Sequence, residues 1–191
     1  RLGWIPKEWE VVRLGEITTI TAGGTPSTQK KEYWNGEIPW MNSGEINLKR
    51  VKSVEGRITK EGLNNSSTKI IPANSVLMAL AGQGKTRGKV ALNEIDVCTN
   101  QYLAAIINLK GIETEFLYQN LDSRYAEIRK MSTGDGGRGG LNLTILKSIK
   151  IPLPPLPEQK KIAQILSTID AKINNLSDQI TETETLKKGL M

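Results

Sequence analysis

The organisation of this chain is decided by residues 151–163, which read IPLPPLPEQKKIA. Four prolines within residues 152–157 favour an extended, stiff connection, because proline fixes φ and removes a backbone donor. Pro157 suits the first position of a helix, and Glu158 suits the positive end of the helix dipole. The stretch therefore predicts a domain over residues 1–151, a proline hinge at 152–157 and a long helix over 158–191.

The segment after the hinge has the apolar spacing of a coiled coil. Six apolar residues recur at alternating intervals of three and four: Ile162, Leu166, Ile169, Ile173, Leu176 and Ile180. A helix of about 34 residues spans ~50 Å, longer than a domain of ~150 residues covers with its own surface. Burying the six side chains contributes on the order of 10 kcal/mol. We expect them to bind another helix, and packing against the chain's own domain is the alternative.

The residues before the hinge read as short strands separated by turns rich in Gly, Asn and Pro. The expected strands cover residues 17–21, 38–42, 75–80, 89–92 and 102–109. Helical spacing over residues 114–131 predicts one amphipathic helix packed on the sheet, with Gly134 as its stop. Five glycines in residues 134–140 predict a loop. A short helix at 142–147 and a strand at 148–151 then lead to the hinge.

The positive charge lies on the predicted domain. The formal charge of the chain is +6; residues 1–151 hold 21 Lys and Arg against 15 Asp and Glu, whereas residues 152–191 hold five of each. Residues 47–89 alone hold nine basic and two acidic side chains. A basic folded surface attracts phosphates and releases their counterions, so we expect a nucleic-acid partner. A merely solvated basic surface is the alternative.

The composition argues against catalysis and metal binding by this chain. It contains no histidine, which is the commonest general base and metal ligand. Its one cysteine, Cys98, has apolar neighbours and is expected to be a buried structural thiol. No apolar stretch approaches the ~18 to 20 residues of a membrane helix. We therefore expect a cytoplasmic chain with neither a metal site nor a catalytic site.

Residues 82–86, GQGKT, resemble the end of a phosphate-binding P-loop. The spacing fails, because the required first glycine would fall at Ala79 and the following segment reads as a strand instead of a helix. An NTP-dependent enzyme is therefore a weak hypothesis. The segment is better interpreted as a basic turn whose glycines allow close approach to a phosphate chain.

Candidate DNA contacts follow from the charge and the turns. For holding phosphates we select Lys69, Lys85, Arg87 and Lys89. For reading base edges we select Asn42, Ser43, Gln83, Thr86 and Arg138. Three aromatic residues either stack on exposed bases or fill the core, and we expect the core: Tyr33, Trp34 and Trp40.

Residues 151–163 look like the segment that closes a target-recognition domain in specificity subunits of type I restriction-modification systems. Four other stretches resemble the same family: GWIPKEW at 3–9, LGEI at 14–17, GGTPS at 23–27 and YWNGEIPW at 33–40. The resemblance covers the whole chain. It implies a mixed α+β target-recognition domain with a twisted, mainly antiparallel sheet, followed by the long coiled-coil helix.

In that family, two target-recognition domains are held apart by a pair of antiparallel helices, and each domain reads one half of a split DNA sequence. The resemblance thus implies a non-catalytic chain that binds double-stranded DNA and docks methyltransferase and restriction subunits. S-adenosylmethionine, ATP and magnesium are expected only in those partner subunits.

The chain departs from the family pattern by holding one domain and one helix, by starting at Arg1 without a methionine, and by ending where family members usually continue. We expect either a half-size subunit or an excised half. Pairing of two copies through the helix, as a homodimer, would restore the two-domain layout. The alternative function is an assembly protein that acts through its helix and whose basic surface is incidental.

Overall fold

Alternating side chains along the central strand β6 (Ser75–Ala79) divide the domain into two apolar layers. Val76 and Met78 pack into one core, and Leu77 and Ala79 pack into the other, as the two-residue period of a strand requires. All four side chains are fully buried, which explains why the strand reads as a continuous apolar run. The structure, a computed structural model, describes residues 4–82, 86–108, 111–132 and 139–189.

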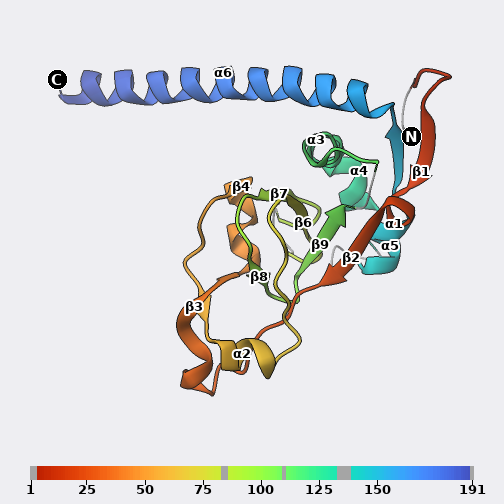
Figure 1. Cartoon of the computed structure of the whole chain (residues 1–191). Coiled ribbons are helices and arrows are strands. Elements are labelled where there is room, and N and C mark those ends of the chain that lie inside the picture. Colours follow the sequence, from red (N-terminus) through yellow and green to blue (C-terminus); the bar gives the residue numbers. More distant parts are fainter. Residues whose placement is uncertain (1–3, 83–85, 109–110, 133–138, 190–191) are drawn as a thin grey trace.

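Strand β6 lies in the middle of a five-stranded sheet with the order β2-β9-β6-β7-β4 (Figure 1). Neighbouring strands are antiparallel except for the parallel pair β4 and β7. The other four strands are β2 (Thr18–Ala22), β4 (Arg50–Val51), β7 (Val90–Asn93) and β9 (Leu103–Asn108). The prediction of a mainly antiparallel sheet is confirmed, and four of its strands begin and end within one residue of the predicted bounds.

Three helices, α3 (Thr114–Ser123), α4 (Tyr125–Lys130) and α5 (Leu143–Ser148), contribute to the core on one face of this sheet. The prediction of a single helix over 114–131 is wrong, because Arg124 leaves the helical conformation with φ −99° and ψ 17°. The Arg124 guanidinium binds the carboxylate of Glu127 at 2.9 Å and the carbonyl of Lys150 at 2.7 Å. At this break, the Arg124 side chain therefore connects the helical layer to the strand that contains Lys150.

The second core lies on the other face of the sheet. There β3 (Trp34–Met41) pairs antiparallel with β5 (Arg57–Ile58) and parallel with β8 (Cys98–Thr99). The short helices of this side are η1 (Lys31–Tyr33), η2 (Ser43–Leu48) and α2 (Lys60–Asn64). Cys98 is fully buried, and burial raises the pKa of its thiol, so the expectation of a buried thiol is confirmed.

The first and last strands of the domain form a separate antiparallel ribbon, β1 (Glu10–Arg13) with β10 (Lys150–Leu153), and α1 (Leu14–Ile17) follows β1. Pro152, the first residue of the hinge expected at 152–157, is a strand residue paired with Val11. A proline is tolerated in a two-stranded ribbon, where its nitrogen needs no partner on the open edge.

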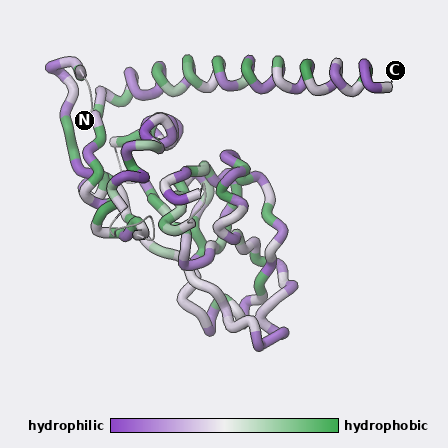
Figure 2. Tube along the Cα trace, turned by 180° about the vertical axis from the view of Figure 1, so that it is seen from behind, coloured by the Kyte–Doolittle hydropathy of each residue, from purple (hydrophilic) through white to green (hydrophobic). Residues whose placement is uncertain are grey.

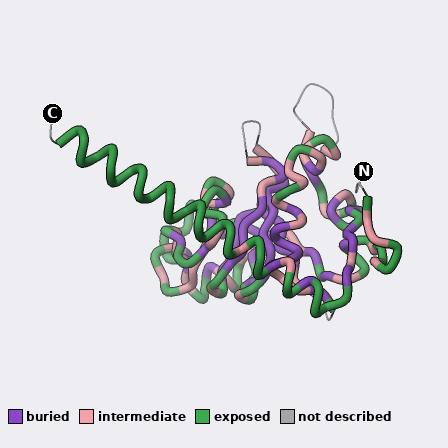
Figure 3. Tube along the Cα trace, turned by 90° about the horizontal axis from the view of Figure 1, so that it is seen from above, coloured by how far each residue is buried: buried purple, intermediate pink, exposed green. Residues whose placement is uncertain are grey.

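The long helix α6 (Leu156–Gly189) begins two residues before the predicted start. It crosses α3 near its beginning and then extends past the edge of the domain (Figures 1 and 3). The predicted long C-terminal helix is confirmed. The division into domain, hinge and helix stays a prediction, and Ala163 of α6 packs into the domain's own core.

Candidate nucleic-acid interface and assembly helix

Loops of the domain converge on residues 100–102, which connect β8 to β9 and which we call the hub loop. The hydroxyl of Thr25 donates to Gln101 Oε1 at 2.5 Å. The Nδ2 of Asn100 donates to Ser43 Oγ at 3.4 Å. The loops that follow β2 and β3 therefore meet at one short polar segment.

Two further segments bind either the hub loop or Thr99, the residue just before it. The amide of Leu80, at the start of the predicted basic turn, donates to the carbonyl of Tyr102 at 2.8 Å. The hydroxyl of Thr68, next to the exposed Lys69, donates to the carbonyl of Thr99 at 3.1 Å. The Tyr102 side chain is itself 49% exposed. Several segments that carry predicted contacts thus surround one loop.

Two glycines allow this close approach. A Cβ on Gly23 would lie 2.2 Å from the carbonyl oxygen of Thr99, and a Cβ on Gly24 would lie 2.2 Å from Ser67 Oγ. Those distances are shorter than any van der Waals contact, so only glycine fits at both positions. The GGTPS stretch is thereby held against the hub loop.

Two of the three aromatic residues, Trp34 and Trp40, bind the loop that follows β2. Tyr33 is buried, as expected for a core residue, whereas Trp34 and Trp40 are half-buried and lie edge to face with ring centroids 5.1 Å apart. Their indole N–H groups donate to the carbonyls of Ser27 at 3.1 Å and Gly24 at 3.0 Å. The two tryptophans therefore lie at the margin of the core, where they fix the loop after β2.

Among the predicted base readers, Asn42 is exposed but caps η2. Its Oδ1 accepts from the amide of Gly44 at 2.8 Å, and its Nδ2 donates to Glu45 at 2.8 Å. The hydroxyl of Thr86 donates to the carbonyl of Ala81 at 3.5 Å. Three other candidates lie outside the described residues: Gln83, Lys85 and Arg138.

The predicted basic stretch does not present all of its charge to solvent, because its arginines bind protein groups. Arg87 is only 6% exposed and donates to the carbonyl of Gly139. Arg57 donates to nearby backbone carbonyls, and Arg50 binds both carboxylate oxygens of Glu115, at 2.5 and 2.7 Å. The expected surface position of Arg87 is therefore wrong, because its guanidinium is buried and binds the backbone at Gly139.

The lysines of the stretch remain nearer to solvent. Lys89 Nζ donates to Asn47 Oδ1 at 2.6 Å, and the carbonyl of Lys49 accepts from the amide of Leu92 at 2.8 Å. Four lysines are exposed: Lys49, Lys52, Lys60 and Lys69. Phosphate contacts by Lys69 and Lys89 stay predictions.

Sequence reasoning missed the hub loop. The available signal was a polar triplet, Asn100 to Tyr102, between two apolar runs that the structure shows as the buried strands β8 and β9. Such a triplet predicts an exposed turn. Its convergence with Thr25 depends on a contact across 76 positions of sequence, which no local pattern contains.

The first half of α6 is fixed to the domain by a polar joint, which consists of Glu115, Gln119, Gln159 and Ser167. The Gln159 side chain is 1% exposed. Its Oε1 accepts from the amide of Glu113 at 2.8 Å, and its Nε2 donates to the carbonyls of Gly111 at 3.1 Å and Pro154 at 2.8 Å. This amide secures the beginning of α6.

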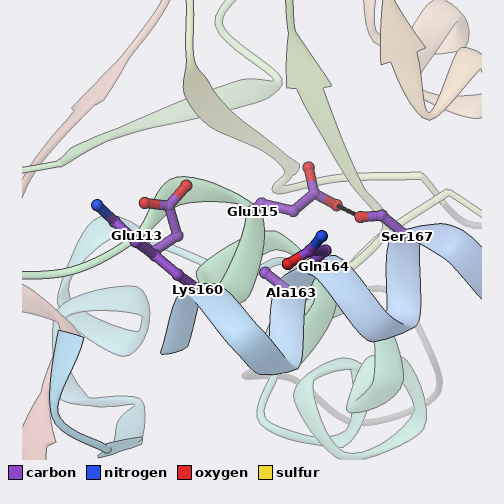
Figure 4. A pocket seen from close by; sticks show the side chains of 6 residues that line it. All are labelled: Glu113, Glu115, Lys160, Ala163, Gln164 and Ser167. Carbon is purple, nitrogen blue, oxygen red and sulfur yellow. Dashed lines mark hydrogen bonds between the residues drawn. The ribbon is translucent and has the colours of Figure 1, made fainter. Parts of the chain in front are cut away.

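The second part of the polar joint centres on Glu115 Oε1. This oxygen accepts from Arg50 at 2.5 Å, from Gln119 Nε2 at 2.9 Å and from Ser167 Oγ at 3.1 Å. Figure 4 shows Glu115 and Ser167 pointing toward each other across the space between the domain and α6. Gln119 Nε2 also donates to the carbonyl of Ala163 at 3.2 Å. The carboxylate thus binds β4, α3 and α6 at one point.

A groove of about 610 Å³ continues from the joint between the domain and α6, and its walls include Tyr118, Asp122 and Asp170. Burial, followed by the charge of Asp122, raises the pKa of Tyr118 to about 12. Arg50 lies over the Tyr118 ring at 5.1 Å and partly opposes this rise. The groove is lined by charges of both signs, because Lys49 and Arg50 lie beside Asp122 and Asp170.

The predicted seam lies on another face of α6. Five of its six members are 41 to 60% exposed: Leu166, Ile169, Ile173, Leu176 and Ile180. At about 100° per residue, the seam is displaced from the polar joint by roughly a third of a turn. Figure 2 shows apolar positions recurring along the whole helix, whose far half runs clear of the domain. Ile162 differs, because it is half-buried against the domain's own core, and its assignment to the partner interface stays a prediction.

The P-loop resemblance lacks its structural context, since the next element after β6 is the strand β7 and not a helix. Within residues 4–82, 86–108, 111–132 and 139–189, no three acidic, cysteine or histidine side chains gather as a metal site would require. No helix in the described part of the chain combines the length and apolar character needed to cross a bilayer.

Comparison with known proteins places this architecture. Residues 6–184 match the model of the type I restriction modification DNA specificity domain. The specificity subunit of the Escherichia coli type I restriction enzyme EcoR124I/EcoR124II is 36% identical over 176 residues, which cover 90% of this chain and 43% of that subunit. The MjaIX specificity subunit of Methanocaldococcus jannaschii is 33% identical over 182 residues, which cover 93% of this chain and 41% of that subunit. The chain spans less than half the length of these relatives.

Solved structures share the fold. The HsdS subunit from Thermoanaerobacter tengcongensis superposes with a TM-score of 0.70 at 23% identity, over 92% of this chain and 40% of that subunit. A chain from a structure described in terms of complex assembly and conformational transition of the type I restriction-modification system gives a TM-score of 0.76 at 24% identity, over 98% of this chain and 45% of that chain. With the family model matched over residues 6–184, this chain belongs to the type I restriction modification DNA specificity domain family.

Proposed function

We propose that this chain recognises one half of a bipartite sequence in double-stranded DNA on behalf of a type I restriction-modification complex. It has no catalytic role: the methyltransferase subunits use S-adenosylmethionine, and the restriction subunit uses ATP and magnesium. The chain docks these subunits in the cytoplasm, where the complex meets its DNA.

The observation that carries this proposal is the hub loop in a chain of this family. The segments that carry Thr25 and Ser43 bind this loop, and the segment that carries the exposed Lys69 binds Thr99 just before it. The side chains of Thr25 and Gln101 are exposed. Charged side chains hold phosphates and fix the register on a duplex, whereas polar side chains on loops read base edges. The arrangement supplies both kinds of group on one part of the domain.

We assign the binding of partner chains to α6. Its exposed seam supports docking of a partner helix, because apolar side chains at alternating intervals of three and four match the knobs-into-holes packing of coiled coils. A second copy of this chain, bound through the same seam, brings a second recognition domain and with it the second half-site.

The second candidate function is an assembly protein without DNA recognition. It is favoured by the inward positions of Arg50, Arg57 and Arg87, which leave less positive charge at the surface than the sequence predicts. The two functions differ in whether the isolated chain binds duplex DNA.

The test is the affinity for duplex DNA at several salt concentrations, measured by fluorescence anisotropy on fragments of genomic DNA. We expect the logarithm of the affinity to fall linearly with the logarithm of salt, by ~0.9 for each phosphate contacted. Lys69→Ala with Lys89→Ala should reduce this slope by about 2 and weaken binding on every fragment. Lys161→Ala, on the exposed surface of α6, is the control. Binding that is absent, or that does not respond to salt, supports the assembly protein instead.

A further inference from the structure

The contact between α6 and its own domain is confined to the beginning of a long helix. Ser167 is the last α6 residue with a hydrogen bond to the domain among the described residues, and α6 continues to Gly189. At 1.5 Å per residue, the helix projects roughly 30 Å beyond that bond. A rotation of about 10° at the joint therefore moves the far end by roughly 5 Å, which exceeds the ~3.4 Å between successive base pairs.

The contact combines apolar packing of Ala163 in the domain's core with directional hydrogen bonds. Gln159 uses both its carbonyl oxygen and its amide nitrogen on backbone groups. Glu115 accepts from Arg50, Gln119 and Ser167 with one oxygen. Hydrogen bonds weaken steeply when they bend, whereas apolar contacts have no preferred direction. Such bonds fix the angle between α6 and the domain as well as the strength of their contact.

The joint also leaves the seam uncovered. Ala163 and Ser167 face the domain, while Leu166 and Ile169 stay exposed on another face of the same turns. The helix α6 therefore binds its own domain and presents an apolar surface at the same time. The contact with the domain does not have to break for that surface to be accessible.

We propose that Glu115, Gln119 and Ser167 are positioning residues that set the angle between the recognition domain and α6, and thereby the number of base pairs that separate two half-sites. The spacing part of this inference rests on the proposed function. The angle itself is a property of the isolated chain and is tested without DNA.

The experiment measures the distance between two spin labels in the full chain by pulsed electron resonance. The labels are placed at Lys52→Cys on the domain and Lys188→Cys near the end of α6, two exposed positions, with the buried thiol removed by Cys98→Val. Labelled chains are diluted with excess unlabelled chain, so that each assembly contains one labelled copy. The joint is broken by Gln119→Leu with Ser167→Ala.

We expect a single narrow distance in the unmodified joint. The broken joint should at least double the width of the distribution or shift its mean by roughly 5 Å, with the domain still folded by circular dichroism. Ser177→Ala is the matched control, because that hydroxyl donates to Ile173 of its own helix and not to the domain. The single variant Ser167→Thr keeps the hydroxyl, so it should show the same narrow distance as the unmodified joint.

An unchanged distribution in the folded double variant overturns the proposal. If the double variant fails to fold, Ser167→Ala alone decides, since it removes only one bond to Glu115 and one to Gln119. In cells that carry the partner subunits, sequencing of methylated sites should show one spacer length for the unmodified chain and additional lengths for the broken joint. If the unmodified chain yields no methylated sites, the proposed function fails, while the distance measurement still decides the role of the joint.

Discussion

Two faces of α6 differ in chemistry. One contacts the domain through polar side chains, and the other is apolar and exposed. The face toward the domain carries Gln159, Ala163 and Ser167, and its contacts include hydrogen bonds with defined partners beside the packing of Ala163 in the core. The other face carries a row of exposed isoleucine and leucine side chains. A net hydrogen bond contributes about 1 kcal/mol, whereas burial of the whole seam contributes on the order of 10 kcal/mol. In our proposals, the first face specifies the geometry of the domain and the helix, and the second supplies affinity for a partner.

The largest expected effect comes from charging the seam. In Ile169→Glu with Ile173→Glu, association with a second helix should weaken by at least ~1,000-fold, because two buried side chains contribute about 3 to 6 kcal/mol and two carboxylates would be desolvated. The monomer should stay folded, since both positions are exposed in the single chain. Sedimentation velocity measures the oligomeric state.

The matched control places the same charges on the opposite side of the helix, as Thr168→Glu with Asn175→Glu, two exposed residues. If the seam variant keeps the mass and partner binding of the unmodified protein, the seam is not the interface. If the control also dissociates, the added charge matters more than its position.

A smaller effect is expected on the face toward the domain. Gln159→Leu should lower the free energy of unfolding by about 3 kcal/mol, because it leaves the Glu113 amide and the carbonyls of Gly111 and Pro154 without a side-chain partner. Urea unfolding measures the change. Gln164→Leu, which alters an exposed amide on the same helix, should change stability by less than about 0.5 kcal/mol. Equal effects of the two substitutions would show that the buried amide has no special role.

The smallest effect concerns the groove beside the joint. The fold raises the pKa of Tyr118 from its ordinary value of 10.0 to about 12, so the folded state favours the neutral phenol. This contribution is complete below pH 10 and is lost as the pH rises from 10 toward 12, by about 2 kcal/mol. In Tyr118→Phe this loss should be missing when urea unfolding is compared at pH 9 and pH 11.5. Tyr102→Phe, at an exposed ring, should behave like the unmodified chain, and a Tyr118 variant with the same alkaline loss would contradict the assignment.

The elements that sequence patterns predicted well are those with local causes. Strand β6 is apolar on both faces, and α6 follows a regular spacing over 34 residues, so composition and periodicity suffice for both. The patterns failed where a distant partner decides the outcome. The helix expected over residues 114–131 is interrupted at Arg124, whose guanidinium binds the distant carbonyl of Lys150. The β1 and β10 strands exist only as each other's neighbours.

The residues of the candidate site also fall into two groups, those that local patterns predict and those whose position depends on a distant partner. The exposed apolar row on α6 was predictable from its regular spacing, whereas the contact of Ile162 with the domain core was not. The role of this row in binding a partner stays a prediction. The charged residues were not predictable individually, because a guanidinium is drawn inward by whichever acceptor lies nearby. Glu115 is 65 positions from Arg50, and Gly139 is 52 positions from Arg87. A charge count describes how much charge a segment carries but not which groups neutralise it.

The β1 and β10 ribbon has a consequence for how such chains change over time. Glu10 pairs with Leu153, and Trp9 donates to Glu158 at the beginning of α6, so the polypeptide enters and leaves the domain at one place. A unit with adjacent ends is readily inserted or replaced, because its removal leaves a short gap for the rest of the chain to close. Recombination within the ribbon would therefore exchange the complete recognition surface between chains as a cassette, while the assembly helix and its seam stay the same.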